Sequence, residues 1–160
     1  MTEDEWIENR ILRKATQRSM FEDRDVWRDG EKVPKQYCVL FREMDDAQKQ
    51  LLENTIGEMF YPVLALWCND DLWTVLGTRD IWSYYGGKLY QAKLDEIDGD
   101  ISLVEPGGVK KDYLKFEASF LRLNKASIEV WASKAPEYFS FWSVLNMFPI
   151  RKTNAPFTNE

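Results

Sequence analysis

The apolar positions between residues 61 and 134 follow the short repeats that are typical of β-strands. Residues 63–68 form a continuous apolar run that ends in the turn-forming residues 69–71, which predicts a buried strand and a reversal of the chain. Alternation at 114–120 predicts a strand with one exposed face, and the slip at 120–121 predicts a bulge. The other expected strands are 37–41, 72–78, 78–85, 88–97, 101–104 and 128–132.

The Gly-Gly pair at 86–87 predicts a tight hairpin, because both positions of such a turn require positive φ. With these glycines at the turn, Tyr84 lies opposite Leu89 and Asp80 lies opposite Lys93. The second pair joins opposite charges across the strands, which contributes about 0.2–1 kcal/mol. Both faces of the hairpin carry apolar or aromatic side chains. The hairpin is therefore either enclosed between two layers or exposes one aromatic face.

Two N-terminal segments begin with helix start signals. Thr2 and Glu5 have the spacing of a capping box, and a narrow apolar stripe then predicts a helix to about residue 18. The aspartate pair at 45–46 offers an N-cap for a second helix, which extends to about residue 59.

The C-terminal segment has the clearest helical repeat. Apolar residues at i, i+3, i+4, i+7 and i+10 from Tyr138 form one stripe, with Pro136 near its start and Pro149 at its end. A helix of this length is marginal alone in water, so the stripe must lie against the sheet.

Together these elements predict one α+β domain: an antiparallel sheet or half-barrel of about six or seven strands, with two N-terminal helices and a C-terminal helix packed on it. A chain of 160 residues is long enough to bury such a core. The expected organisation is an N-terminal helix and charged connector (1–36), a short strand and helix (37–60), the antiparallel sheet (61–134), a capping helix (135–150) and a tail (151–160).

Charge limits the classes of partner. The chain has 27 acidic and 21 basic residues, for a net charge of −6. This balance opposes binding to nucleic acids and to anionic membrane surfaces, and it suits a basic protein partner. General acidity also keeps proteins dispersed in solution, which is the alternative explanation. The N-terminus is acidic, whereas a signal peptide would be basic, and the two cysteines do not form a CxxC pair. Both observations predict a cytoplasmic protein.

The sequence has no histidine, which excludes Ser-His-Asp and Cys-His nucleophilic sites and imidazole metal sites. Cys38 and Cys68 lie in apolar surroundings typical of packing groups. No phosphate-binding loop or EF-hand calcium loop is present. We therefore expect no cofactor, no metal and no enzymatic activity, since an enzyme would have to work with carboxylates alone.

Four carboxylates follow the hairpin within residues 95–100, and no Lys or Arg occurs from 95 to 109. Three interpretations stay open: a solvated turn, an acidic patch for a partner, and a catalytic carboxylate pair. Trp and Tyr rings precede this segment, and such rings anchor interfaces because they give much contact area at low entropic cost. The predicted partner-binding residues are Asp95, Glu96, Asp98, Asp100, Trp82 and Tyr84.

Two stretches, WTVLGTRDI at 73–81 and EYFSFWSVLNM at 137–147, resemble small bacterial immunity proteins from toxin–immunity loci, including contact-dependent growth inhibition systems. The resemblance implies tight, specific inhibition of a cognate toxin, often by acidic groups that cover a basic nuclease site. The order of strands and terminal helix over about 60–150 is similar to a pleckstrin-homology or GRAM-like half-barrel, although the basic cluster that lipid binding needs is missing around 86–87.

These observations lead to one principal hypothesis and one alternative. The principal hypothesis is a non-enzymatic immunity protein that binds and neutralises a basic toxin domain through an acidic, aromatic face. The alternative is a pleckstrin-like scaffold or adaptor that binds a peptide or protein subunit.

Overall fold

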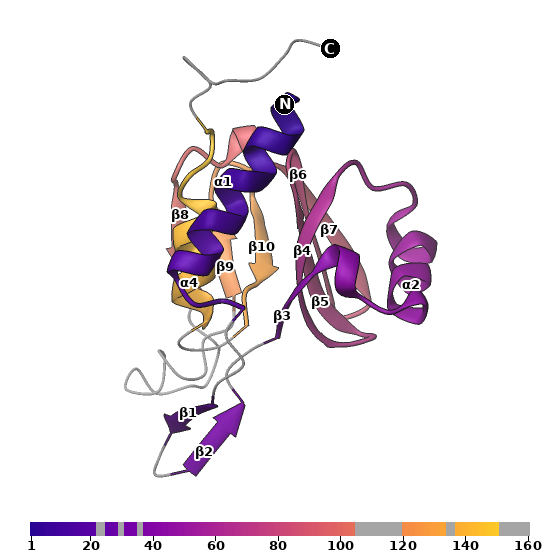
Figure 1. Ribbon diagram of the computed structural model, residues 1–160, viewed down its shortest axis with the longest axis vertical. Coiled ribbons are helices and arrows are strands. Elements are labelled where there is room, and N and C mark those ends of the chain that lie inside the picture. Colours follow the sequence, from indigo (N-terminus) through magenta and orange to yellow (C-terminus); the bar gives the residue numbers. More distant parts are fainter. Residues whose placement is uncertain (22–24, 29–30, 35–36, 105–119, 134–136, 151–160) are drawn as a thin grey trace.

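The computed structural model describes residues 1–21, 25–28, 31–34, 37–104, 120–133 and 137–150, and Figure 1 labels its elements. Its largest sheet is antiparallel, with the strand order β3-β4-β5-β6-β7. These strands are β3 (Cys38–Leu40), β4 (Pro62–Asn69), β5 (Leu72–Gly77), β6 (Asp80–Tyr85) and β7 (Lys88–Lys93).

A second antiparallel sheet has the order β10-β9-β8, and a separate pair is formed by β1 and β2. The strands are β8 (Ile101–Leu103), β9 (Phe120–Leu123), β10 (Ile128–Trp131), β1 (Asp25–Arg28) and β2 (Glu31–Pro34). The helices are α1 (Glu3–Gln17), α2 (Asp46–Ile56) and α4 (Glu137–Leu145), and the 3₁₀ turns are η1 (Phe41–Glu43) and η2 (Leu94–Glu96).

The α+β class and the antiparallel pairing are confirmed, but the strand count and the helix arrangement differ from the prediction. The expected single sheet or half-barrel is replaced by a sheet of five strands and a sheet of three. Figure 1 shows α2 on one side of the larger sheet, and α1, α4 and the smaller sheet on the other. The charged connector expected at 22–36 contains the β1–β2 pair, and the strand expected at 114–120 lies outside the described residues except for its last residue.

The local turn and cap signals are confirmed. Gly86 and Gly87 have φ of 60° and 76°, and β6 pairs with β7 so that Asp80 lies opposite Lys93, as predicted. Thr2 forms a capping box at the start of α1. Asp45 does the same for α2, which ends at Ile56 rather than at residue 59.

The predicted strand 88–97 is shorter than expected, because η2 replaces its last part. Leu94 and Ile97 are both 0% exposed. A strand would direct residues three apart to opposite faces, whereas a 3₁₀ turn places them on the same side. The need to bury both side chains therefore favours the turn, and the two residues between them face solvent.

A ladder of aromatic rings crosses the face of the larger sheet that α2 covers. The Trp73 ring stacks on Trp67 at 6.3 Å and on Tyr84 at 5.4 Å, with interplanar angles of 3° and 14°. Trp82 joins the same cluster with Leu52 of α2. Of the two arrangements left open for the hairpin, enclosure between layers therefore holds for β6, whereas four of the six residues of β7 are exposed.

The opposite face of the larger sheet holds the main core, which also includes the smaller sheet. Both helices on this side contribute the apolar stripe that the sequence predicts. Ile7, Ile11 and Ala15 of α1 are buried, as are Tyr138 and Phe141 of α4. The first helix is thus an integral part of the packed structure.

Two hydroxyl groups join the larger sheet to the smaller one. Thr74 Oγ1 donates to the Trp131 carbonyl at 2.5 Å, and the Trp131 N–H donates to Ser83 Oγ at 3.0 Å. The two hydroxyl oxygens are 2.8 Å apart. Because the Thr74 hydroxyl donates its proton to the carbonyl, the Ser83 hydroxyl must donate to Thr74. The two hydroxyls and the Trp131 backbone thus form a closed hydroxyl ring, in which each residue donates once and accepts once. Both backbone groups of the buried Trp131 therefore have hydrogen-bond partners on the larger sheet.

A buried carboxylate joins α4 to the edge of the larger sheet. Glu137, in the first turn of α4, is 0% exposed. Its Oε1 accepts from the Tyr37 N–H at 2.9 Å and its Oε2 accepts from the Cys38 N–H at 3.3 Å. Hydrogen bonds to a charged acceptor are stronger than neutral ones, so this pair fixes the start of β3.

Candidate functional site

The acidic segment, residues 95–100, presents its four carboxylates to solvent. Asp95 and Glu96 belong to η2, and Asp98 and Asp100 lie in the turn before β8. All four residues are exposed. The segment is held by the fully buried side chains at 94 and 97, so its charged groups are presented on an ordered backbone.

The second half of the acidic segment is tied to the turn between β9 and β10. Lys125 Nζ forms an ion pair with Asp98, and this hydrogen bond raises the pKa of Lys125. Asn124 Nδ2 donates to the Asp100 carbonyl at 3.2 Å and to its carboxylate at 3.1 Å. Asp95 and Glu96 therefore form the less neutralised half of the segment.

The two predicted aromatic residues do not lie beside these carboxylates. Trp82 is 3% exposed and packs with the α2 cluster, where the half-buried Tyr84 also packs. Residues two apart on a strand share a face, so β6 directs both rings toward α2. Leu94 and Ile97, by contrast, anchor η2 in the main core on the other side of the sheet. The structure thus brings the four acids together and places the rings in a different layer.

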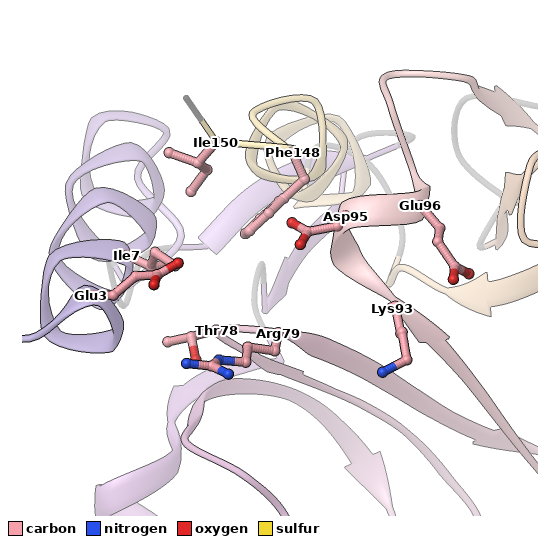
Figure 2. Close-up of a pocket in the computed structure, with 9 residues that line it drawn as sticks. All are labelled: Glu3, Ile7, Thr78, Arg79, Lys93, Asp95, Glu96, Phe148 and Ile150. Atoms are coloured by element: carbon pink, nitrogen blue, oxygen red, sulfur yellow. The ribbon is translucent and has the colours of Figure 1, made fainter. Parts of the chain in front are cut away.

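A pocket of about 400 Å³ adjoins the acidic segment (Figure 2). It lies among four segments that are far apart in the sequence: the start of α1, the β5–β6 turn, the end of β7 with η2, and the chain after α4. Its lining residues are Glu3, Ile7, Thr78, Arg79, Lys93, Asp95, Glu96, Phe148 and Ile150. Asp95 and Glu96 thus belong both to the acidic segment and to the pocket.

The floor of the pocket is fixed by Asp4. Its two carboxylate oxygens accept from Arg79 Nε and Nη2, each at 3.1 Å, and Thr78 Oγ1 donates to Oδ1 at 2.7 Å. The guanidinium also lies 4.7 Å from the centre of the Phe60 ring. The hydrogen bond to Asp4 raises the pKa of Arg79, although desolvation opposes this effect. The bidentate bond sets the position of Arg79 and joins α1 to the β5–β6 turn.

The sequence analysis missed this pocket because its residues meet only in the folded chain. The sequence did show the acidic first turn of α1, which forms one side of the pocket. The helix dipole explains acidic residues at that position without any pocket. Nothing in the sequence pairs Asp4 with Arg79, which is 75 residues away.

The residues that the structure describes include no cluster of three or more His, Cys, Asp or Glu side chains arranged to hold a metal ion. None of the helices in these residues has the length and apolar character needed to cross a membrane. Comparison with known proteins found no matching family, no similar curated protein and no similar solved structure. Function is therefore inferred from the geometry of this chain.

Proposed function

We propose that this chain is a non-enzymatic, cytoplasmic immunity protein that binds and neutralises a basic toxin domain through its acidic segment. The observation that carries this proposal is the exposure of four carboxylates on a short segment that the fully buried side chains of Leu94 and Ile97 hold in place. A preordered segment loses little conformational freedom on binding, so more of its interaction energy remains as affinity. The aromatic half of the predicted face is not part of the proposal, because Trp82 is buried.

The charge distribution supports a basic partner. The whole chain carries a net charge of −6, and residues 95–100 contribute four carboxylates. Asp98 pairs with Lys125. Within the described part of the chain, Asp95 and Glu96 form no ion pair and are available to a cationic surface. Such a field accelerates association with a basic surface, by tenfold or more at low salt.

The test compares two charge-reversed proteins for their binding to a candidate basic toxin domain. The first carries Asp95→Lys and Glu96→Lys. The control carries Asp70→Lys and Asp71→Lys, an exposed acidic pair in the β4–β5 turn with the same change in charge. We expect the first to associate roughly tenfold more slowly and with a weaker salt dependence, and the control to differ little from the native chain.

Growth protection of cells that express the toxin domain gives a second readout. Loss of protection by the first variant alone supports the proposal, provided that both variants keep the native near-UV circular dichroism. Equal protection by both variants would contradict it.

The adaptor function is the second candidate, and one feature favours it. The strand β7 forms an edge of the larger sheet, and four of its six residues are exposed. Peptides bind such edges by adding a strand. However, Lys88 and Lys93 occupy the two ends of β7, and edge lysines discourage strand addition. Stable binding to a housekeeping protein subunit, with no effect on a toxin domain, would favour the adaptor.

A further inference from the structure

We infer that a second pocket, beside α1, binds the diphosphate group of a small soluble ligand. This pocket has a volume of about 290 Å³ and lies between α1 and the chain that follows α4. Its lining residues are Arg10, Arg13, Lys14, Gln17 and Met147, and we call it the basic pocket. It shares no residue with the acidic segment, so the inference does not rest on the proposed function.

The basic pocket carries three positive charges. Arg10, Arg13 and Lys14 line it, and no carboxylate lines it within the described part of the chain. No ion pair among the described residues involves any of the three cations. The pocket is therefore a local surplus of positive charge on a chain whose net charge is −6. A surplus of this kind attracts an anion.

The sequence of α1 places no acidic residue beside these cations. On a helix, a side chain contacts the residues three and four positions away. None of the positions three or four away from Arg10, Arg13 or Lys14 holds an aspartate or a glutamate. Arg10 instead lies at these spacings from both other cations, and like charges placed in this way destabilise a helix. An anion bound among them would relieve the repulsion.

The helix dipole does not account for all three charges. The negative end of the dipole favours cations only near the last turn of a helix, and Lys14 is the basic residue in the last turn of α1. The carbonyl groups of residues 14–16 also accept from the N–H groups of residues 18–20. Arg10 and Arg13 thus lie outside the region in which the dipole would favour them.

Contacts with neighbouring residues order the walls of the basic pocket. The Arg10 guanidinium lies 5.7 Å from the centre of the Trp6 ring, a cation–π contact that restrains this side chain. At the end of α1, Ser140 Oγ of α4 donates to the Arg18 carbonyl at 3.1 Å, and Figure 1 shows the two helices side by side. Met147 packs against the main core. The pocket is therefore built on two helices that are fixed to each other.

The arrangement of donors favours a diphosphate over a single carboxylate. Positions 10, 13, 14 and 17 follow one face of α1, and at 1.5 Å per residue they extend over about 10 Å. One carboxylate would neutralise one of the three charges. Two linked phosphoryl groups carry more charge and more acceptor oxygens along this row, and arginine binds phosphate oxygens through two parallel N–H bonds. Gln17 adds a neutral amide donor at the end of the row.

Binding is tested by titrating inorganic pyrophosphate into the full chain in a phosphate-free buffer, while backbone amide and arginine Nε–H resonances are recorded by NMR. We expect saturable shifts centred on residues 10–17 and 147. At the same ionic strength, acetyl-Asp-Asp-Asp-amide, which carries its negative charge on separate carboxylates, should bind more weakly. ADP presents the diphosphate group as an ester, so its affinity relative to pyrophosphate identifies whether the ligand is a free or an esterified diphosphate.

Two neutralised proteins then locate the binding site. The double variant Arg13→Gln, Lys14→Gln should bind pyrophosphate about two- to fivefold more weakly for each charge removed. The control Arg42→Gln, Lys88→Gln removes one arginine and one lysine at exposed positions elsewhere and should bind as the native chain does. Native-like amide spectra of both variants establish that they are folded.

Thermal unfolding gives a second readout, because a ligand that binds only the folded state raises Tm as its concentration increases. We expect pyrophosphate to raise the Tm of the native chain and of the control, and to raise it less in Arg13→Gln, Lys14→Gln. The inference would be overturned by the absence of saturable shifts in the native chain, by an unchanged affinity in this variant, or by tighter binding of the aspartate peptide.

Discussion

Replacing Thr74 with valine should open the hydroxyl ring that joins the two sheets. Valine has nearly the shape of threonine, so the substitution removes the hydroxyl without leaving a cavity. The Trp131 carbonyl then loses its donor at 2.5 Å, and the Ser83 hydroxyl loses its acceptor at 2.8 Å. Ser83 has only a weaker acceptor nearby, the Trp73 carbonyl at 3.5 Å.

The size of the effect follows from burial. Thr74 and Ser83 are both 0% exposed, so water does not replace the missing bond. Leaving one buried acceptor unpaired costs about 1–3 kcal/mol. We expect Thr74→Val to lower the free energy of unfolding by about 2 kcal/mol, which corresponds to a decrease in Tm of about 4–8 °C for a chain of this size.

Thr55→Val is the matched control. Its hydroxyl donates to the Leu51 carbonyl at 2.8 Å within α2, where the bond supplements the helical pattern. Urea denaturation should show a change within about 0.5 kcal/mol for this variant, with the same m-value for both proteins. If Thr74→Val is no more destabilising than Thr55→Val, the ring does not join the sheets as described.

Two further predictions concern buried polar groups. Glu137→Gln removes one of the two carboxylate oxygens that accept from the Tyr37 and Cys38 N–H groups. Urea denaturation should then show a decrease of about 1–3 kcal/mol in the free energy of unfolding. The control Glu129→Gln, at a half-exposed position, should change this free energy little. Burial raises the pKa of Tyr85, whose hydroxyl donates to the Glu129 carbonyl. The folded state holds this proton more tightly than the unfolded state does, so the Tyr85 hydroxyl contributes to folding stability below the unfolded pKa of about 10. This contribution is lost as the pH rises above that value. Tyr85→Phe should therefore reduce the loss of stability in alkaline denaturation curves.

The sequence predicted the features that depend on neighbouring residues. The capping box at Thr2, the Gly86-Gly87 turn and the apolar stripe of α4 are local, and each is present as expected. Where both sides of the hairpin are apolar, the pattern does not tell which layer covers which face. The placement of Trp82 against α2, away from the acids, depended on that missing information.

The division into two sheets and the pocket also depend on contacts between distant residues. The hydroxyl ring joins position 74 to position 131, and the pocket floor joins position 4 to position 79. The sequence around Leu94 does contain a local indication of the 3₁₀ turn, because Leu94 and Ile97 are three residues apart with two acids between them. That spacing is also compatible with a twisted strand end, so only the packed core distinguishes the two.

The spacing of Leu94 and Ile97 has a consequence for how this protein could change its specificity. These two side chains secure η2, while the exposed positions 95, 96, 98 and 100 contribute little to the interior. Substitutions at 95 and 96 would alter recognition at small thermodynamic cost, whereas Asp98 has a positive φ of 48° and Asp98 and Asp100 are tied to the β9–β10 turn. A library randomised at positions 95 and 96, selected against unrelated cationic domains, should yield folded variants with new targets from a single framework.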